Sequence, residues 1–227
     1  MINSLVIGAA SELGSRIVLG LVKLNVSVTA VSRSALSTDV LNAFKTANNH
    51  SIHNLVDSYL ELEIDKDYDY VFFTTGVFNH SSIVNSTEME ISKEINENVT
   101  QPIQLTKRIL DKQKTAVISN KCFVYIGSTC AYQGISGMST YCASKFALRG
   151  FVQSMNDEYA SSGNRFSLVS MGTMNTRMGR KHAESIGRKI SSLIDPSYVA
   201  DRVLDSVFNI DNILEPEMIF RYRNSKN

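Results

Sequence analysis

The sequence of 227 residues predicts an α/β fold, a doubly wound parallel sheet of seven strands with helices on both faces. Short apolar runs alternate along the chain with longer helix-like segments, which is typical of a parallel sheet covered on both sides. The first apolar run leads directly into a turn of small residues and then a helix. No change in composition and no Ser/Pro-rich linker divides the chain, so a single domain over residues 1–227 is expected.

Seven runs have the length and apolar character of buried strands. They cover residues 4–8, 26–31, 52–56, 70–74, 122–127, 166–171 and 218–220. The segments between them predict helices over residues 13–24, 37–48, 87–112, 139–161 and 196–207, with a further helical piece at 181–192. Asp195 and Pro196 mark the start of the last helix, because Asp caps a helix and Pro tolerates its first position.

The charge pattern indicates neither a nucleic-acid-binding protein nor a membrane protein. The formal net charge is +1, and the Lys and Arg residues are scattered rather than gathered in a stripe. Residues 3–10 form an apolar run too short for a signal sequence or a membrane span, and no cationic leader precedes it. A soluble, cytoplasmic protein is therefore expected.

The cysteines and histidines predict neither disulfides nor a metal site. Cys122, Cys130 and Cys142 are odd in number and lack C-x-x-C spacing, so reduced thiols are expected. The four histidines form no H-E-x-x-H motif. A thiol nucleophile would need a nearby His, and none occurs between His80 and His182. The thiols are therefore interpreted as packing groups.

Acid–base chemistry is indicated between Ser128 and Lys145. Tyr141 and Lys145 are four residues apart and so share one face of a helix, while Ser128 follows the fifth predicted strand. A phenol has an ordinary pKa near ~10, and a neighbouring ammonium is expected to lower that pKa by favouring the phenolate. A serine hydroxyl can donate to a carbonyl oxygen and stabilise the charge that develops when hydride arrives. These groups together suit carbonyl reduction or alcohol oxidation.

The turn from Gly8 to Gly14 predicts a dinucleotide site. Its small residues let the backbone approach a pyrophosphate at the positive N-terminus of the following helix. Ser11 and Leu13 lie in this turn and are expected to contact the cofactor together with the two glycines. Taken alone, the turn also fits an ordinary tight connection between a strand and a helix.

The end of the second predicted strand indicates which nucleotide is used. Ser32 and Arg33 stand where an acidic residue would accept the adenosine ribose hydroxyls. Arg binds a 2′-phosphate through charge-assisted, often bidentate hydrogen bonds, so NADP(H) is favoured over NAD(H). Arg16 is a secondary candidate for this contact. The alternative for Arg33 is a solvated surface arginine.

Taken in their order along the chain, these motifs resemble those of the short-chain dehydrogenase/reductase family, of the single-domain kind with a Tyr-x-x-x-Lys active site. The resemblance covers nearly the whole chain. Gly8 and Gly14 match the first and last glycines of that family's T-G-x-x-x-G-x-G turn. The resemblance implies a Rossmann-like fold, an NADP(H) cofactor and a small carbonyl or alcohol substrate. It also implies a catalytic tetrad of Asn98, Ser128, Tyr141 and Lys145, and cofactor contacts from Asp57, Gly76, Tyr141, Lys145, Gly172 and Thr176 besides Gly8, Ser11, Leu13, Gly14, Ser32 and Arg33.

The resemblance also implies a role for each member of the tetrad. Tyr141 donates a proton to the substrate oxygen or accepts one in reverse, and Ser128 polarises that oxygen. Lys145 lowers the pKa of Tyr141 and holds the nicotinamide ribose. The Asn98 carbonyl positions a water that links Lys145 to solvent. Because Pro102 has no N–H, that carbonyl would lack its helical partner and be free for the water.

Three segments depart from the family pattern. Glu12 replaces the middle glycine of the turn, Phe73-Thr74-Thr75 replace N-N-A, and Met171 replaces a proline. Glu12 matters most, because a carboxylate near a phosphate is repulsive unless it faces solvent or a basic partner. The departures bear on cofactor affinity more than on chemistry, since every catalytic position has the expected residue type.

The resemblance places the substrate between residues 129–133, 135–138 and 177–192, with Met138, Met178 and Tyr132 in the pocket. The last segment is basic, which suits an anionic or carrier-linked substrate such as a 3-oxoacyl group, or else a solvated helix face. A ketone reductase is the first hypothesis. The second is a catalytically silent dinucleotide-binding protein with a regulatory or scaffold role.

The resemblance further implies a homodimer or homotetramer formed through the helices at 87–112 and 139–161. Leu148, Phe151, Val152 and Met155 could form that contact or could equally belong to the core.

Overall fold

The computed structural model describes residues 2–47, 49–55, 57–112, 120–208 and 215–221. Within these residues seven strands form one parallel sheet in the order β3-β2-β1-β4-β5-β6-β7, which confirms the predicted fold class. The strands are β1 (Asn3–Ile7), β2 (Ser27–Ser32), β3 (Ser51–Asn54), β4 (Tyr70–Phe73), β5 (Cys122–Ile126), β6 (Arg165–Met171) and β7 (Glu217–Phe220). The strand order reverses between β1 and β4, and ligands of such sheets bind beyond the carboxyl ends of the strands at that point.

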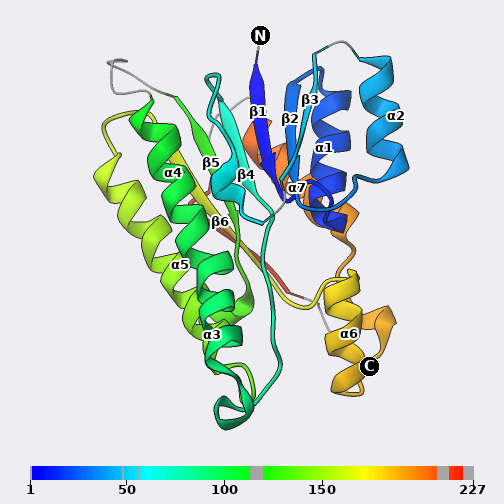
Figure 1. The fold of residues 1–227 in the computed structure, drawn as a ribbon, viewed down its shortest axis with the longest axis vertical. Helices are drawn as coiled ribbons and strands as arrows, with labels where there is room; N and C mark the ends of the chain where they lie inside the picture. Colours follow the sequence, from blue (N-terminus) through cyan, green and yellow to red (C-terminus); the bar gives the residue numbers. More distant parts are fainter. Residues whose placement is uncertain (1, 48, 56, 113–119, 209–214, 222–227) are drawn as a thin grey trace.

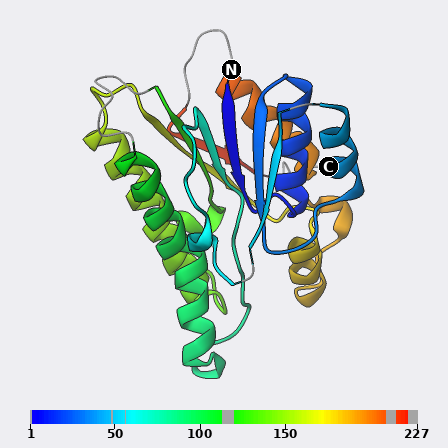
Figure 2. The same cartoon turned by 45° about the horizontal axis from the view of Figure 1, so that its top comes forward.

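Helices cover both faces of the sheet (Figure 1; Figure 2). One face carries α1 (Glu12–Lys23), α2 (Thr38–Thr46) and α7 (Pro196–Phe208), and the other carries α3 (Glu88–Ile95), α4 (Gln101–Asp111) and α5 (Ser139–Glu158). A π-turn, η3 (Asn96–Thr100), joins α3 to α4. Short 3₁₀ turns are η1 (Tyr59–Glu61), η2 (Ile83–Asn85), η4 (Thr129–Ala131) and η5 (Ile190–Ser192). Helix α6 (Arg177–Ser185) lies beyond the strand ends, below α1 in Figure 1.

The two sheet faces bury separate apolar cores. The first packs α1 and α7 on the sheet, with Ile17 and Val203 fully buried. The second packs α4 and α5, and it includes Leu148, Val152 and Met155. Phe151 packs against the same core. These four residues therefore belong to the core of the chain and give no support to an interface between subunits.

The structure corrects the helical piece predicted at 181–192. Helix α6 begins at Arg177 and ends at Ser185, and the rest of the predicted piece, residues 186–192, contains the short turn η5. The Thr176 hydroxyl caps α6 by accepting from the Gly179 N–H at 3.2 Å. Glycine is required there, because a Cβ on Gly179 would lie 1.9 Å from the Met174 carbonyl oxygen.

The remaining predicted elements agree with the observed ones within a few residues. The predicted helix at 87–112 is observed as α3, η3 and α4 in succession. Residue 48 of the predicted helix 37–48 and residue 56 of the predicted strand 52–56 lie outside the described residues. In the part of the chain that is described, no helix is both long and apolar enough to span a membrane.

Candidate active site

A cleft of about 550 Å³ opens at the carboxyl ends of the strands. Its wall includes the predicted site residues Ser11, Leu13, Gly76, Ser128, Tyr141, Lys145, Gly172 and Thr176. They come from the loops after β1, β4, β5 and β6 and from the start of α5. The structure therefore brings residues that are far apart in the sequence to the edge of the sheet where a ligand is expected.

Ser128, Tyr141 and Lys145 meet at the end of β5. Ser128 caps η4, and its hydroxyl accepts from the Cys130 N–H at 3.1 Å. Tyr141 and Lys145 lie in the first turns of α5. The Lys145 Nζ donates to the Ile126 carbonyl oxygen at 3.0 Å and lies 5.5 Å from the centre of the Tyr141 ring. An ammonium, a phenol and a hydroxyl thus share one side of the cleft.

Asn98 ties the segment after β4 to this group. Its side chain accepts from the Val77 N–H at 2.9 Å and donates to the Val77 carbonyl at 2.9 Å and to the Ser144 hydroxyl at 3.0 Å. A Cβ on Gly76 would lie 3.3 Å from Asn98 Oδ1 and 3.6 Å from Lys145 Nζ. Glycine at position 76 therefore leaves room for Asn98 and Lys145 to approach the same point of the backbone.

Burial controls the titration of these groups. Burial lowers the pKa of Lys145 to about 8. Burial also raises the pKa of Tyr141 above its ordinary value, and the neighbouring Ser128 hydroxyl offsets only part of that rise. The net pKa of Tyr141 is therefore raised and not lowered as expected, because burial outweighs the hydrogen bond of Ser128, and the nearby Glu94, Cys130 and Cys142 add to the rise. Tyr141 therefore keeps its proton at neutral pH.

The π-turn has a cause in the sequence. In η3 the Gln101 N–H donates to the Asn96 carbonyl, five residues back, so the helix is wider here than a regular α-helix. Pro102 follows at once, and its ring would clash with the Asn98 carbonyl in a regular turn. The wider turn relieves this clash, and Pro102 has no N–H to give to Asn98. That the Asn98 carbonyl holds a water stays a prediction.

Pro102→Ala tests the role of this turn. We expect the new N–H to bond the Asn98 carbonyl, to restore a regular helix and to lower kcat about tenfold, the effect of one hydrogen bond of about 1.4 kcal/mol. Steady-state kinetics and a crystal structure of the variant check this. Pro196→Ala, at the start of the distant α7, is the control. Unchanged turnover in a variant with a regular helix would contradict the proposed water site.

The turn after β1 is closed tightly around its glycines. Gly8 has a φ of +88°, and a Cβ on Gly14 would lie 2.4 Å from the Gly8 carbonyl oxygen. The Ser11 hydroxyl caps α1 by accepting from the Gly14 N–H at 2.9 Å. The Thr74 hydroxyl donates to the Gly8 carbonyl at 3.0 Å. The N-terminus of α1 consequently opens to the cleft and suits a pyrophosphate.

Glu12 has the basic partner that its position requires. Each oxygen of its carboxylate accepts from the Arg177 N–H at 2.9 Å, at the start of α6. Oε1 also accepts from Arg180 Nη2 at 2.9 Å. Glu12 therefore links the nucleotide turn to α6, and its charge is balanced by Arg180 and by the positive end of that helix.

Arg180→Gln leaves the Glu12 carboxylate without its cation. We expect dinucleotide affinity to fall about tenfold, because an unbalanced carboxylate then faces the pyrophosphate site. Adding Glu12→Gln to the same chain removes the repulsion and restores most of the affinity. Titration of dinucleotide binding to both variants checks this, with Lys181→Gln, a neighbouring exposed cation outside the cleft, as control. A double variant as weak as the single one would contradict the charge balance.

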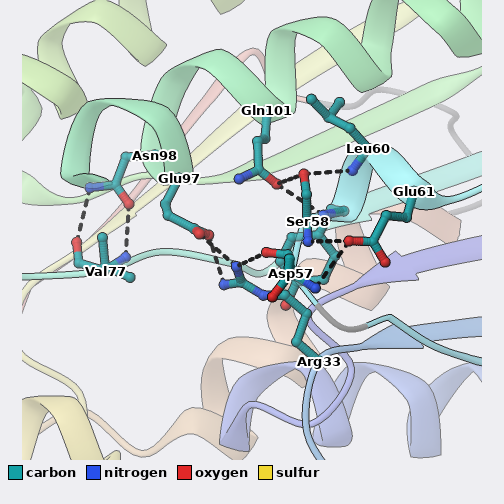
Figure 3. A network of polar contacts seen from close by, with 10 residues as sticks. Arg33, Asp57, Ser58, Leu60, Glu61, Val77, Glu97, Asn98 and Gln101 are labelled. Atoms are coloured by element: carbon teal, nitrogen blue, oxygen red, sulfur yellow. Dashed lines mark hydrogen bonds and ion pairs between the residues drawn. The ribbon is translucent and has the colours of Figure 1, made fainter. Parts of the chain in front are cut away.

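Arg33 is neither a solvated arginine nor a free cation. Its guanidinium donates from Nη1 to Glu97 Oε1 at 2.6 Å and from Nη2 to Glu97 Oε2 at 2.8 Å (Figure 3). Nη1 also donates to the Asp57 carbonyl at 3.0 Å, and the group lies 4.6 Å from the centre of the Tyr59 ring. The ends of β2 and β3 and the π-turn thus meet at Arg33.

Ser32, an expected cofactor contact, is hydrogen-bonded within its own turn. It is buried, and its hydroxyl donates to the Ser34 carbonyl at 2.6 Å and accepts from the Ser34 N–H at 3.0 Å. The side chain therefore closes the turn after β2. Arg16, the secondary candidate, lies exposed on α1.

Sequence reasoning missed an aromatic wall of the cleft. Phe78 packs edge-on against Tyr141, with 4.9 Å between ring centres, and against His182, at 5.0 Å. His80 lies 5.3 Å from His182, whose Nδ1 is buried without a hydrogen-bond partner among the described residues. Burial lowers the pKa of His182. The signal that could have found Phe78 and His80 is their position just after β4, at the same sheet edge as Ser128.

The predicted substrate segments contribute only in part. Met138, Met178, Ile186 and Arg188 line the cleft. Tyr132 does not, since its hydroxyl donates to Glu217 Oε2 at 2.8 Å, on the side of β7. The wall is therefore largely apolar.

Neither a metal site nor a disulfide is observed in the described part of the chain. No group of three or more His, Cys, Asp or Glu side chains could hold a metal ion there. The three cysteines are free and buried.

Comparison with known proteins identifies a family and several similar proteins. The family model described as short chain dehydrogenase matches residues 3–187. The 3-oxoacyl-[acyl-carrier-protein] reductase FabG of Buchnera aphidicola subsp. Acyrthosiphon pisum is 27% identical over 192 residues, 79% of this chain and 76% of that protein. Ketoacyl reductase HetN of Nostoc sp. is 25% identical over 216 residues, 90% of this chain and 75% of that protein.

Solved structures share the fold. A 4-hydroxyisoleucine dehydrogenase mutant complexed with NADH and succinate has a TM-score of 0.84 at 16% identity and covers 98% of each chain. ElxO with NADP bound has a TM-score of 0.80 at 18% identity, covering 97% of this chain and 96% of that one. Because the family model covers most of the sequence, the chain belongs to the short-chain dehydrogenase/reductase family of oxidoreductases.

Proposed function

We propose that the chain is one catalytic domain that reduces a ketone to an alcohol with NADP(H), or catalyses the reverse, with Tyr141 as general acid and base. The observation that carries this proposal is the convergence of Ser128, Tyr141 and Lys145 in the cleft that the nucleotide turn also lines. A carbonyl compound in that cleft meets a proton donor and a polarising hydroxyl at the same edge of the sheet.

The residues present fit a dinucleotide. The close approach of Gly8 and Gly14 leaves no side chain in the way of a pyrophosphate, and the positive end of α1 faces the cleft. Gly172 and Thr176 line the cleft near the start of α6 and are proposed to contact the nicotinamide end. Arg33 and Asp57 meet beyond the ends of β2 and β3 and are proposed to hold the adenosine end.

Each catalytic side chain has a role that its environment supports. Tyr141 is a partly buried, protonated phenol, the form that donates a proton to a developing alkoxide. Ser128 donates a hydrogen bond to the same oxygen. With a pKa of about 8, Lys145 is mostly an ammonium at neutral pH and holds the nicotinamide ribose hydroxyls. When bound, NADPH supplies the hydride. Asn98 fixes the Val77 backbone beside Lys145.

The apolar wall supports an aliphatic ketone such as a 3-oxoacyl group. Met138, Met178 and Ile186 offer side chains that an alkyl chain can contact. Two of the similar proteins carry the names 3-oxoacyl-[acyl-carrier-protein] reductase and ketoacyl reductase. A homodimer or homotetramer that works in the cytoplasm is part of this proposal, and it rests on the family resemblance.

A panel of 3-oxoacyl thioesters, 3-oxo esters, simple ketones and aldehydes tests the proposal. Each compound is mixed with the protein and either NADPH or NADH, and nucleotide oxidation is followed by absorbance. We expect oxidation of NADPH with at least one ketone, and faster than that of NADH. Tight nucleotide binding without turnover on the whole panel would instead favour the catalytically silent binding protein.

A further inference from the structure

The Arg33–Glu97 pair joins two distant segments beyond the end of β2, where the proposed function places the adenosine end of the cofactor. Arg33 follows β2, whereas Glu97 lies in the π-turn, 64 residues later. The two groups meet through both ends of the guanidinium fork, at 2.6 and 2.8 Å. The Glu97 side chain is 6% exposed and that of Arg33 is 27% exposed. Water and salt therefore screen this pair less than they would screen a surface ion pair.

Figure 3 shows that two residues close to Glu97 in the sequence are themselves bonded to other segments, which holds Glu97 in place. Asn98, the next residue, is bonded to both polar groups of the Val77 backbone. Gln101, one turn further, accepts from the Tyr59 N–H at 3.0 Å. Three side chains of one helical stretch thus reach the ends of β2, β3 and β4. The Glu97 carboxylate is consequently held in a fixed position beside Arg33.

This arrangement changes what Arg33 can do for a 2′-phosphate. Arg33 would bind a phosphate most strongly through two parallel hydrogen bonds from Nη1 and Nη2. Both of these groups already donate to the two oxygens of the Glu97 carboxylate. A phosphate must either displace Glu97 or bind beside it, and in both cases the negative charge of Glu97 opposes it. A ribose hydroxyl is not opposed, because a carboxylate oxygen can accept its hydrogen bond. The neutral pair therefore discriminates less between the two nucleotides than a free arginine would.

We propose that Glu97 is a specificity-determining residue. It occupies both Nη groups of Arg33 and so reduces the ratio of NADP(H) affinity to NAD(H) affinity. The inference rests on the proposed function for the position of the adenosine ribose. It concerns nucleotide binding, so it is tested without turnover.

Glu97→Gln is the direct test, because glutamine has the shape of glutamate without its charge and keeps one hydrogen bond to Arg33. Dissociation constants are measured by titration for NADPH and NADH, and for 2′,5′-ADP and 5′-AMP, which lack the nicotinamide. We expect NADPH and 2′,5′-ADP to bind about tenfold more tightly, corresponding to about 1.4 kcal/mol for one removed charge. NADH and 5′-AMP should change less than about twofold. Glu88→Gln removes an exposed carboxylate at the start of α3 and is the matched control.

Glu97→Asp provides a second variant that keeps the charge. Its shorter side chain loosens the contact with Arg33, so the NADPH-to-NADH affinity ratio should lie between those of the wild type and Glu97→Gln. An affinity ratio that is unchanged or lower in both variants would overturn the inference alone, since Glu97 would then only hold Arg33 in place. Failure of the wild type to bind either dinucleotide would overturn the proposed function and this inference together.

Discussion

Tyr141→Phe removes turnover and leaves nucleotide binding intact. The phenylalanine ring keeps the edge-on contact with Phe78, so the wall of the cleft is preserved. What is lost is the hydroxyl that gives its proton to the substrate oxygen, and we expect kcat to fall about 10³-fold, within the range of a positioned proton donor. The dissociation constant for NADPH should change less than about twofold.

The measurement is kcat with the best ketone of the panel, together with a nucleotide titration of the same variant. Tyr198→Phe is the matched control, because Tyr198 lies exposed on α7 and outside the cleft. The control should keep full activity. A Tyr141→Phe variant that retains more than about one tenth of wild-type kcat would show that another group delivers the proton.

Lys145→Met lowers both turnover and nucleotide affinity. Methionine keeps the length and the packing of the stem, but it loses the ammonium that lies beside Asn98 and Gly76. We expect kcat to fall about 10³-fold, because Tyr141 then gives up its proton without the cation that lies 5.5 Å from its ring centre. The nucleotide should bind about tenfold more weakly through the lost hydrogen bonds to its ribose.

The pH profile distinguishes the role of the Lys145 charge from a merely structural one. Burial lowers the pKa of Lys145 to about 8, so the ammonium is complete well below that pH and is lost above it. Wild-type kcat should therefore decline as pH rises through about 8. Lys145→Met should lack that decline, whereas Lys93→Met, an exposed residue of α3, should keep it. If kcat of Lys145→Met declines with pH as in the wild type, the decline reports the titration of another group.

The sheet could be predicted from the sequence because its strands are buried on both faces. Residues 122–126 and 166–171 read as continuous apolar or small runs, and β5 and β6 are found there. Helix α6 could not be placed in the same way. Its apolar residues are few, Met178 and Ala183 beside Gly179, and its start depends on capping by Thr176 and on Glu12, which lies 165 residues away from Arg177 in the sequence.

The candidate site was predictable where its pattern is local. Tyr141 and Lys145 share one helix, so their spacing alone places them together. The pairs Arg33–Glu97 and Glu12–Arg180 depend on segments that meet only at the edge of the folded sheet. The raised pKa of Tyr141 was missed for a related reason, since burial of a phenol is a property of the packed cleft and not of the neighbouring sequence.

A crystal structure of the chain with NADPH and a ketone tests the proposed chemistry most directly. We predict that the nicotinamide ring lies in the cleft, with its reactive C4 beside the ketone carbon, and that the Tyr141 and Ser128 hydroxyls both lie within hydrogen-bonding distance of the ketone oxygen. A nicotinamide ring bound elsewhere, or a Tyr141 hydroxyl directed away from that oxygen, would contradict hydride transfer with Tyr141 as the proton donor.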